Sequence, residues 1–168
     1  MRFLTIFRLL LTALWLGSAC FFIGVAMSAF GVLDVPEVAN GRELAGAVVN
    51  RNLTVLNISG LTIGVILLVT SFAGTKSLSR IGVWTERFLL FILTAACAVG
   101  QFVIITWMSL IRSQLGKPLV EVAADDPLLI RFNQLHQYSR WILLTAMIAA
   151  LLSFFVISLK SDTNKVEA

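Results

Sequence analysis

The chain has 168 residues, of which 58% are hydrophobic and 13% are charged, whereas about a quarter of the residues in a typical soluble domain are charged. The charges are absent from four long stretches, and the longest polar stretch is too short to bury a core of its own, so the composition excludes a separate soluble domain. The net charge of +4 comes from basic residues that flank the apolar stretches. This placement indicates contacts with lipid headgroups and predicts no nucleic acid partner.

Four stretches of the sequence predict helices that span a membrane. A helix crosses the hydrocarbon core with roughly 20 apolar residues, and it satisfies its own backbone amides where no water is present. We therefore predict an all-α integral membrane four-helix bundle, a single domain over 1–159 followed by an irregular cytoplasmic tail at 160–168. The stretches without Asp, Glu, Lys, Arg or His are 9–33, 53–73, 88–111 and 141–159.

The first stretch begins like a signal peptide, and Leu16–Cys20 faintly matches a lipoprotein cleavage site. The apolar run continues to Leu33, beyond the roughly 7–15 residues of a signal's apolar region, so we expect a retained helix. Gly17, Gly24 and Gly31 are spaced seven residues apart. Because small residues let membrane helices approach closely, we expect this face of the helix to contact a neighbouring helix at Gly24.

The second predicted helix starts before its apolar stretch. Asn40-Gly41 can begin a helix that runs through 42–52 directly into the span at 53–73. One face of this helix carries an acidic residue, then two amides, then two glycines: Glu43, Asn50, Asn57, Gly60 and Gly64. Polar groups of this kind usually face the interior of a membrane bundle.

The third stretch places Thr94, Cys97 and Gln101 on one helix face. Cys97 lies near the middle of its span, as Cys20 does in the first, so we expect the two cysteines at similar depth. Two cysteines inside spans are not the disulfide framework of a secreted protein. With His136 they are weak candidates for metal ligands, since Cys and His are ligands that copper prefers.

The fourth helix has a strong start signal in Asp125-Asp126-Pro127, an Asp cap followed by proline at the first helical position. A helix from Pro127 to Leu159 is about 50 Å long, whereas the hydrocarbon is about 30 Å thick. We therefore expect two helices, the second and the fourth, to extend beyond the bilayer on the non-cytoplasmic side. The fourth also offers small residues for packing: Ala146, Ala149, Ala150 and Ser153.

His136 is the only histidine, and Arg140 lies one helical turn further along. In one interpretation His136 points toward Asn50 or Asn57 and closes an outward-opening pocket, with Glu43 as the acceptor for Arg140. In the other, the amides only join neighbouring helices and His136 is an interfacial residue. The ligand-binding candidates are Asn50, Asn57, Gln101, His136 and Arg140.

The distribution of basic residues predicts the topology. The two terminal tails and the middle loop hold seven Lys and Arg residues, and the first and third loops hold six. Six of the nine acidic residues also lie in the first and third loops. Because positive charge favours the cytoplasmic side, we place both termini in the cytoplasm, and we expect a bacterial inner membrane.

Short motifs in the first and fourth helices carry a family resemblance: Trp15-x-Gly17 followed by Phe21-Phe22 and Phe30, and Phe132-x-x-Leu135-His136-x-x-Ser139. They resemble the small four-helix proteins typified by transmembrane protein 205, a domain of unknown function distantly grouped with CopD-type copper-resistance membrane proteins. Over nearly the whole chain this resemblance implies a four-helix bundle, and it draws attention to His136 and Ser139. Family members tend to have proline where this chain has Met27.

The sequence contains no HExxH motif, no nucleophile–base pair and no phosphate-binding loop, so we predict that the protein is not an enzyme. We expect an accessory subunit that packs against other membrane subunits, or against itself, within the lipid bilayer. The alternative is a small protein that binds or transports a metal or a tetrapyrrole, haem or chlorophyll, through His136. No cofactor is required by the sequence.

Overall fold

The computed structural model describes residues 2–166 apart from 37, 39 and 74–79. Within that part of the chain every regular element is helical, and four helices are long and apolar enough to cross a membrane. The prediction of an all-α bundle with four candidate spans is therefore confirmed. The elements are α1 (Arg2–Leu33), α2 (Gly41–Ala73), α3 (Arg80–Val99), the π-helix η2 (Gly100–Ile105), α4 (Thr106–Leu115), the 3-10 turn η3 (Leu119–Glu121) and α5 (Pro127–Val166).

The helices are longer than the charge-free stretches predicted. The first begins at Arg2, the third runs from Arg80 to Leu115 through η2, and α5 continues through Val166, where we had expected an irregular tail. All four candidate spans exceed 30 residues. The expectation that only the second and fourth helices are longer than the bilayer is thick is therefore wrong. The reason is that arginine and lysine end a membrane span without ending a helix, because both are good helix formers.

Two predicted helix starts are confirmed. Asn40, with a positive φ of 56°, precedes α2, and its carbonyl accepts the backbone N–H groups of Glu43 and Leu44. Asp126 caps α5, because its Oδ1 accepts the N–H of Leu128 at 2.8 Å. Both caps satisfy backbone groups that the first turn of a helix leaves free.

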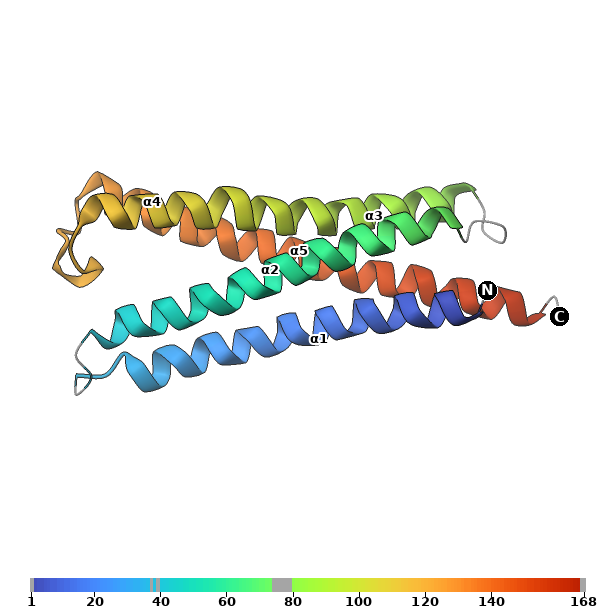
Figure 1. The fold of residues 1–168 in the computed structure, drawn as a ribbon, viewed down its shortest axis with the longest axis horizontal. Helices are drawn as coiled ribbons and strands as arrows, with labels where there is room; N and C mark the ends of the chain where they lie inside the picture. The colour runs from blue at the N-terminus through green and yellow to red at the C-terminus, as the bar shows by residue number, and fades with distance from the viewer. Residues whose placement is uncertain (1, 37, 39, 74–79, 167–168) are drawn as a thin grey trace.

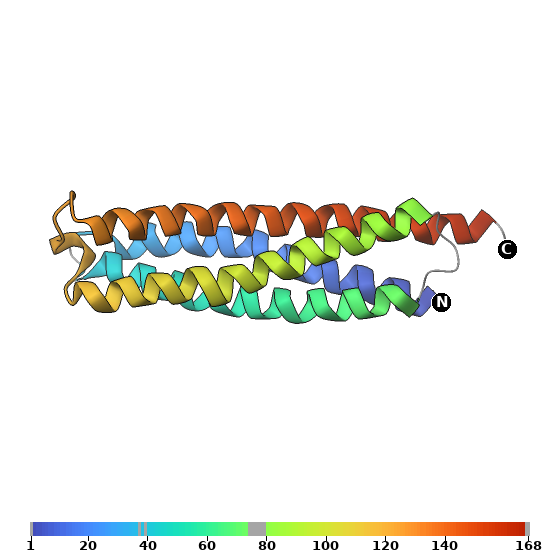
Figure 2. The ribbon, with the colours of Figure 1, turned by 90° about the horizontal axis from the view of Figure 1, so that it is seen from above.

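The four long helices are α1, α2, the continuous helix formed by α3, η2 and α4, and α5. They form a ring in which α1 contacts α2 and α5, and α3 contacts the same two helices. Both termini lie at one end of the bundle (Figure 1), which we call the terminal end. The described residues of the first loop and the third loop, 116–126, lie at the other end, which we call the loop end. Figure 2 shows that the third long helix continues through η2 without a break between α3 and α4.

The core lies in the middle of the bundle and depends on small residues. Trp15, from α1, donates its indole Nε1–H to the carbonyl of Leu56 at 3.1 Å. A Cβ on Gly60 would lie 2.5 Å from that indole nitrogen and 2.6 Å from the sulfur of Cys97, so only glycine fits there. The small face predicted for α5 is buried in full: Ala146, Ala149, Ala150 and Ser153.

The glycine face of α1 points away from the rest of the chain, so the prediction that Gly24 contacts a neighbouring helix is wrong. A Cβ on Gly17, Gly24 or Gly31 would meet nothing within 4 Å. The inward face of α1 carries Trp15 and Ala19. Spacing identifies a face that can pack closely, but in lipid both faces are apolar, and so the spacing does not tell which one faces inward.

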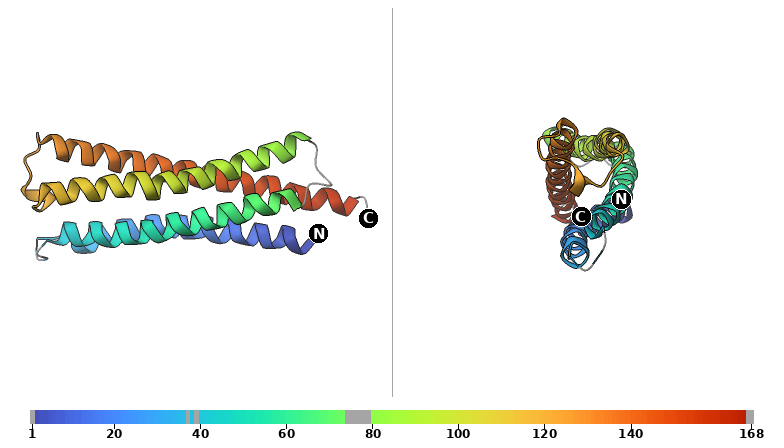
Figure 3. Two further views of the ribbon diagram at one scale, coloured as in Figure 1. Left: turned by 45° about the horizontal axis from the view of Figure 1, so that its top comes forward. Right: turned by 90° about the vertical axis from the view of Figure 1, so that its left-hand side faces the viewer.

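The helices separate toward the loop end. There α1 and α2 form one pair and α4 and α5 form the other, and the two pairs diverge (Figure 3, left). Contacts agree with the view, because α4 packs on α5 whereas α2 contacts α3 and η2. This separation creates the space in which the candidate site lies.

Candidate functional site: a cavity at the loop end

A cavity of about 1090 Å³ lies between α1, α2, α4 and α5. Sites for small molecules usually measure about 300–1,000 Å³, so this one is large for a bundle of four helices. The 3-10 turn η3 contributes Leu119 and Val120 to its lining, and the third loop crosses the mouth of the bundle at this end (Figure 3, right).

The cavity has an extensive apolar wall that includes Phe22 and Met27 of α1 and Phe132, Trp141 and Met147 of α5. Met27 is 73% exposed and Trp141 58% exposed. These side chains therefore belong both to the cavity lining and to the outer surface of the bundle. The wall is continuous with the outer surface of the bundle.

The polar part of the lining is cationic. Arg42, Arg112 and Arg140 line the cavity together with one acidic residue, Glu43, which gives a net charge of +2 with the histidine neutral. The Arg42 Nε lies 4.0 Å from the carboxylate of Asp34, an exposed pair. Arg140 donates to the amide oxygen of Gln137 on its own helix at 3.4 Å.

Arg112 extends from α4 toward α2. Its Nη2 would lie 3.5 Å from a Cβ placed on Gly46, so the guanidinium rests over that glycine. The Nε of Arg112 is buried and has no hydrogen-bond partner. Within the described residues no carboxylate pairs with Arg112, and this cation therefore enters the cavity without a counterion from the chain.

Glu43 holds the third loop in place. Its Oε1 accepts the backbone N–H of Leu119 at 3.3 Å, a bond that links α2 to η3. The prediction that Glu43 is the acceptor for Arg140 is therefore wrong. The carboxylate is close to a free backbone donor of the loop, which sequence spacing could not reveal because 76 residues separate the two.

The structure brings together some of the predicted site residues. Asn50, His136 and Arg140 line the same cavity. His136 is exposed, and in the described part of the chain no hydrogen bond joins it to α2. The expected closure of a polar pocket by His136 against Asn50 or Asn57 is therefore not seen, although His136 and Asn50 share the cavity.

Asn57 and Gln101 lie outside the cavity lining, deeper in the bundle. Asn57 is buried, and a Cβ on Gly100 would approach its amide nitrogen to 3.1 Å. Gln101 belongs to η2, and its buried Oε1 has no hydrogen-bond partner. One amide thus lies within the π-helix and the other lies beside it. A π-helix often occurs at functional sites, and no sequence signal predicted this one.

The two cysteines do not face each other. Cys97 is buried in the cluster that contains Trp15 and Ala19, whereas Cys20 is exposed. The shared cluster places Cys97 at the level of residues adjacent to Cys20, so the prediction of similar depth holds. Within the residues that the structure describes, no three His, Cys, Asp or Glu side chains are grouped as metal ligands.

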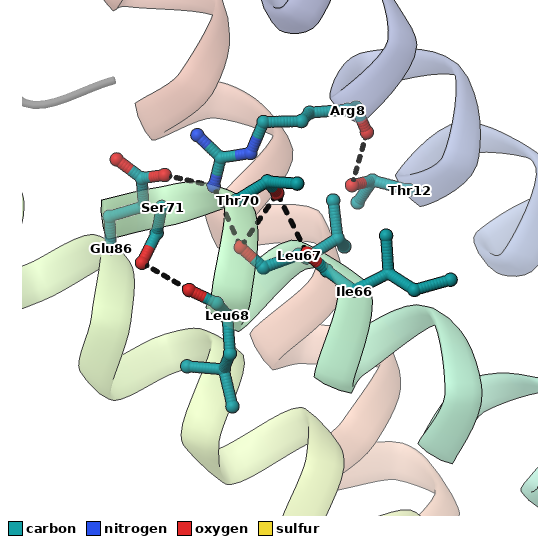
Figure 4. A network of polar contacts seen from close by, with 8 residues as sticks. All are labelled: Arg8, Thr12, Ile66, Leu67, Leu68, Thr70, Ser71 and Glu86. Atoms are coloured by element: carbon teal, nitrogen blue, oxygen red, sulfur yellow. Dashed lines mark hydrogen bonds and ion pairs between the residues drawn. The ribbon is translucent and has the colours of Figure 1, made fainter. Parts of the chain in front are cut away.

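Sequence reasoning missed a buried ion pair at the terminal end. Arg8 of α1 donates from Nη2 to Glu86 of α3 and to the carbonyl of Leu67 at 3.4 Å (Figure 4). Both side chains are only 2–3% exposed. Arg8 is one of the basic residues that the topology prediction counts in the terminal tails, and Glu86 lies just before the third charge-free stretch. A signal was available in the sequence. The two residues have opposite charges and precede the first and third spans, and in a four-span topology both of these span starts lie on the same side of the membrane.

Comparison with known proteins identifies a family. A protein-family model described as "Domain of unknown function (DUF4149)" matches residues 10–117, which covers 108 of the 168 residues. The match includes α2 and η2 and ends before α5, so the His136 motif lies outside it. No curated protein and no solved structure matches this chain.

Proposed function

The chain belongs to the DUF4149 family, whose description names no activity, and we propose from its site that it is a non-enzymatic membrane protein that binds a hydrophobic molecule in the loop-end cavity. The observation that carries the proposal is the cavity of about 1090 Å³ with an apolar wall. A large concave site with a few convergent polar groups is the usual form of a small-molecule site.

A cavity-filling variant tests this function. Ala26 lines the cavity on α1, so Ala26→Trp should occupy part of it and abolish binding of an apolar fluorescent dye by the purified protein. Val32→Trp is the matched control, because Val32 is 69% exposed on the same helix and lies outside the lining. Equal dye binding by both variants and the unmodified chain would contradict the proposal.

The predicted metal or tetrapyrrole ligand stays an alternative occupant of this same cavity. Its support is the position of His136 in the lining, together with the resemblance to transmembrane protein 205 and, more distantly, to CopD-type proteins. Protein purified from its native membrane would then carry a visible absorption band or bound copper, and His136→Ala would lose it. A colourless, metal-free preparation that retains dye binding favours the lipophilic ligand.

A second role, as an accessory subunit, is favoured by the outward glycine face of α1. Gly17, Gly24 and Gly31 leave open space beside the helix, and small residues are typical of membrane helix interfaces. A partner bound there would be lost from native-membrane purification on Gly24→Leu, while the bundle itself would keep its melting temperature. Copurification that is unchanged by this substitution would argue against the role.

We also propose that both termini are cytoplasmic, in a bacterial inner membrane, on the support of the charge asymmetry. The cavity would then open on the far side of the membrane. A cysteine introduced at Ser161 should react only with a permeant reagent in intact cells, and labelling by an impermeant reagent would invert the orientation.

A further inference from the structure

We infer that the ligand of the loop-end cavity is a membrane lipid with an anionic headgroup, whose charge is bound by Arg112 and Arg140. This inference rests on the proposed function and specifies the class of ligand. It depends on three observations: the unbalanced positive charge of the lining, the position of Arg112, and the continuity of the apolar wall with the outer surface.

The charge of the lining favours an anionic ligand. Three arginines face one glutamate, and the carboxylate of that glutamate is engaged with the N–H of Leu119. Arg42 has Asp34 as a partner outside the cavity. Arg112 and Arg140 therefore remain as cations without a carboxylate from the described residues. Arg140 is exposed, whereas Arg112 is half-buried and its Nε is buried, so it is at Arg112 that an unpaired charge is costly.

The position of Arg112 is suited to a phosphate or a carboxylate. A guanidinium forms paired hydrogen bonds with either group. Arg112 reaches over Gly46, where a larger side chain would compete for the space, and its Nε is buried without a partner. The small residue at 46 thus lets the cation lie inside the cavity instead of pointing to water.

The apolar wall distinguishes a lipid from a free anion. A phosphate ion would use the arginines and leave the surface formed by Phe22, Phe132 and Met147 uncovered. Acyl chains would cover it. Because Met27 and Trp141 lie both in the lining and on the outer surface, a lipid can reach the cavity sideways from the bilayer.

Competition between two lipids tests the inference. Protein stripped of lipid in a neutral detergent is equilibrated with equal amounts of phosphatidylglycerol and phosphatidylcholine of identical chains, and bound lipid is counted by native mass spectrometry. We expect the anionic lipid to be preferred by about tenfold or more, in keeping with the strength of charge-assisted hydrogen bonds. Inorganic phosphate at the same concentration should not displace it.

Variants locate the preference. Arg112→Gln and Arg140→Gln should each reduce it severalfold, and Gly46→Leu should do so with every charge retained, since it displaces the Arg112 side chain. Arg51→Gln is the matched control, because Arg51 is an exposed arginine of α2 outside the lining. The melting temperature of each variant shows whether it is folded. Arg112→Gln and Gly46→Leu both report on Arg112, the first by removing its charge and the second by moving it, and Arg140→Gln reports on the second cation.

The outcomes separate the inference from the proposed function. Equal binding of the two lipids, or an unchanged preference in folded Arg112→Gln and Gly46→Leu, overturns the anionic lipid while leaving a cavity that binds an apolar dye. Displacement by inorganic phosphate alone also overturns it, in favour of a free anion. If the unmodified chain binds neither lipid nor dye, both the inference and the proposed function are contradicted.

Discussion

At the terminal end the buried Arg8 pairs with Glu86 of another helix, whereas at the loop end Arg112 lies in a cavity with no carboxylate from the described residues beside it. Both arginines interrupt apolar helices that could each cross a membrane. The first has its counterion within the fold, so the helices close around the pair. The second has none among the residues that the structure describes, and the helices around it stay apart. The comparison shows that a buried arginine whose counterion lies within the fold accompanies a closed end of the bundle, whereas an arginine without one accompanies the cavity.

The largest effect should follow from removing the counterion at the terminal end. Glu86→Ala leaves the buried Arg8 uncompensated and should lower the free energy of unfolding by about 3–5 kcal/mol, measured by denaturant titration in detergent. The double variant Arg8→Met, Glu86→Leu should recover most of that loss, because apolar residues can replace a buried pair. A double variant as unstable as the single one would show that packing, and not charge, closes this end.

A smaller loss in the free energy of unfolding is expected in the central core, between the two ends of the bundle. Gly60→Leu would force its side chain against the Trp15 indole and the Cys97 sulfur, and overpacking of this kind costs about 1–3 kcal/mol. Thermal unfolding in detergent measures it. Gly24→Leu is the matched control on the outward face of α1, where no loss is expected. Equal losses in both would mean that the outward glycine face is packed after all.

At the loop end a local defect should have a modest effect. Asp126→Ala removes the cap that accepts the Leu128 N–H, and the loss of such a cap costs about 1 kcal/mol. Hydrogen exchange should show faster opening of the first turn of α5, with the Arg8–Glu86 region unaffected. Faster exchange at both ends would indicate that the two regions unfold as one unit.

The smallest effect on stability is expected at Arg112 itself. Arg112→Gln removes a cation that has no ion-pair partner among the described residues, and because an unpaired charge away from water is costly, the free energy of unfolding should not fall. Denaturant titration without added lipid measures it. A loss comparable to that of Glu86→Ala would show that Arg112 supports the fold, and the contrast between the two ends would then fail.

The parts of the fold that local chemistry determines could be predicted. Asp126 and Pro127 mark a helix start, and the alanine face at 146–150 indicates close packing. Both signals hold regardless of how the other helices are arranged. The glycine face of α1 and the Arg8–Glu86 pair could not be predicted in the same way. In lipid, apolar character does not separate inside from outside, and the ion pair joins residues 78 positions apart.

The candidate site was predictable only in outline. Asn50, His136 and Arg140 do share one cavity, as their outer positions on the second and fourth helices suggested. Arg112 was not among the predicted residues, because an arginine at the end of an apolar stretch is usually a topology signal. Its position over Gly46 depends on how the second and third long helices separate at the loop end, which the sequence does not reveal.

The cavity occupies one end of the bundle only, and this position has a consequence for exchange with the membrane. A bilayer consists of two monolayers, and a chamber confined to one end of a spanning protein can take molecules from just one of them. The cytoplasmic and opposite leaflets are then unequal sources for the protein. Reversing its orientation would change which lipids it meets, even though every contact within the bundle stayed the same.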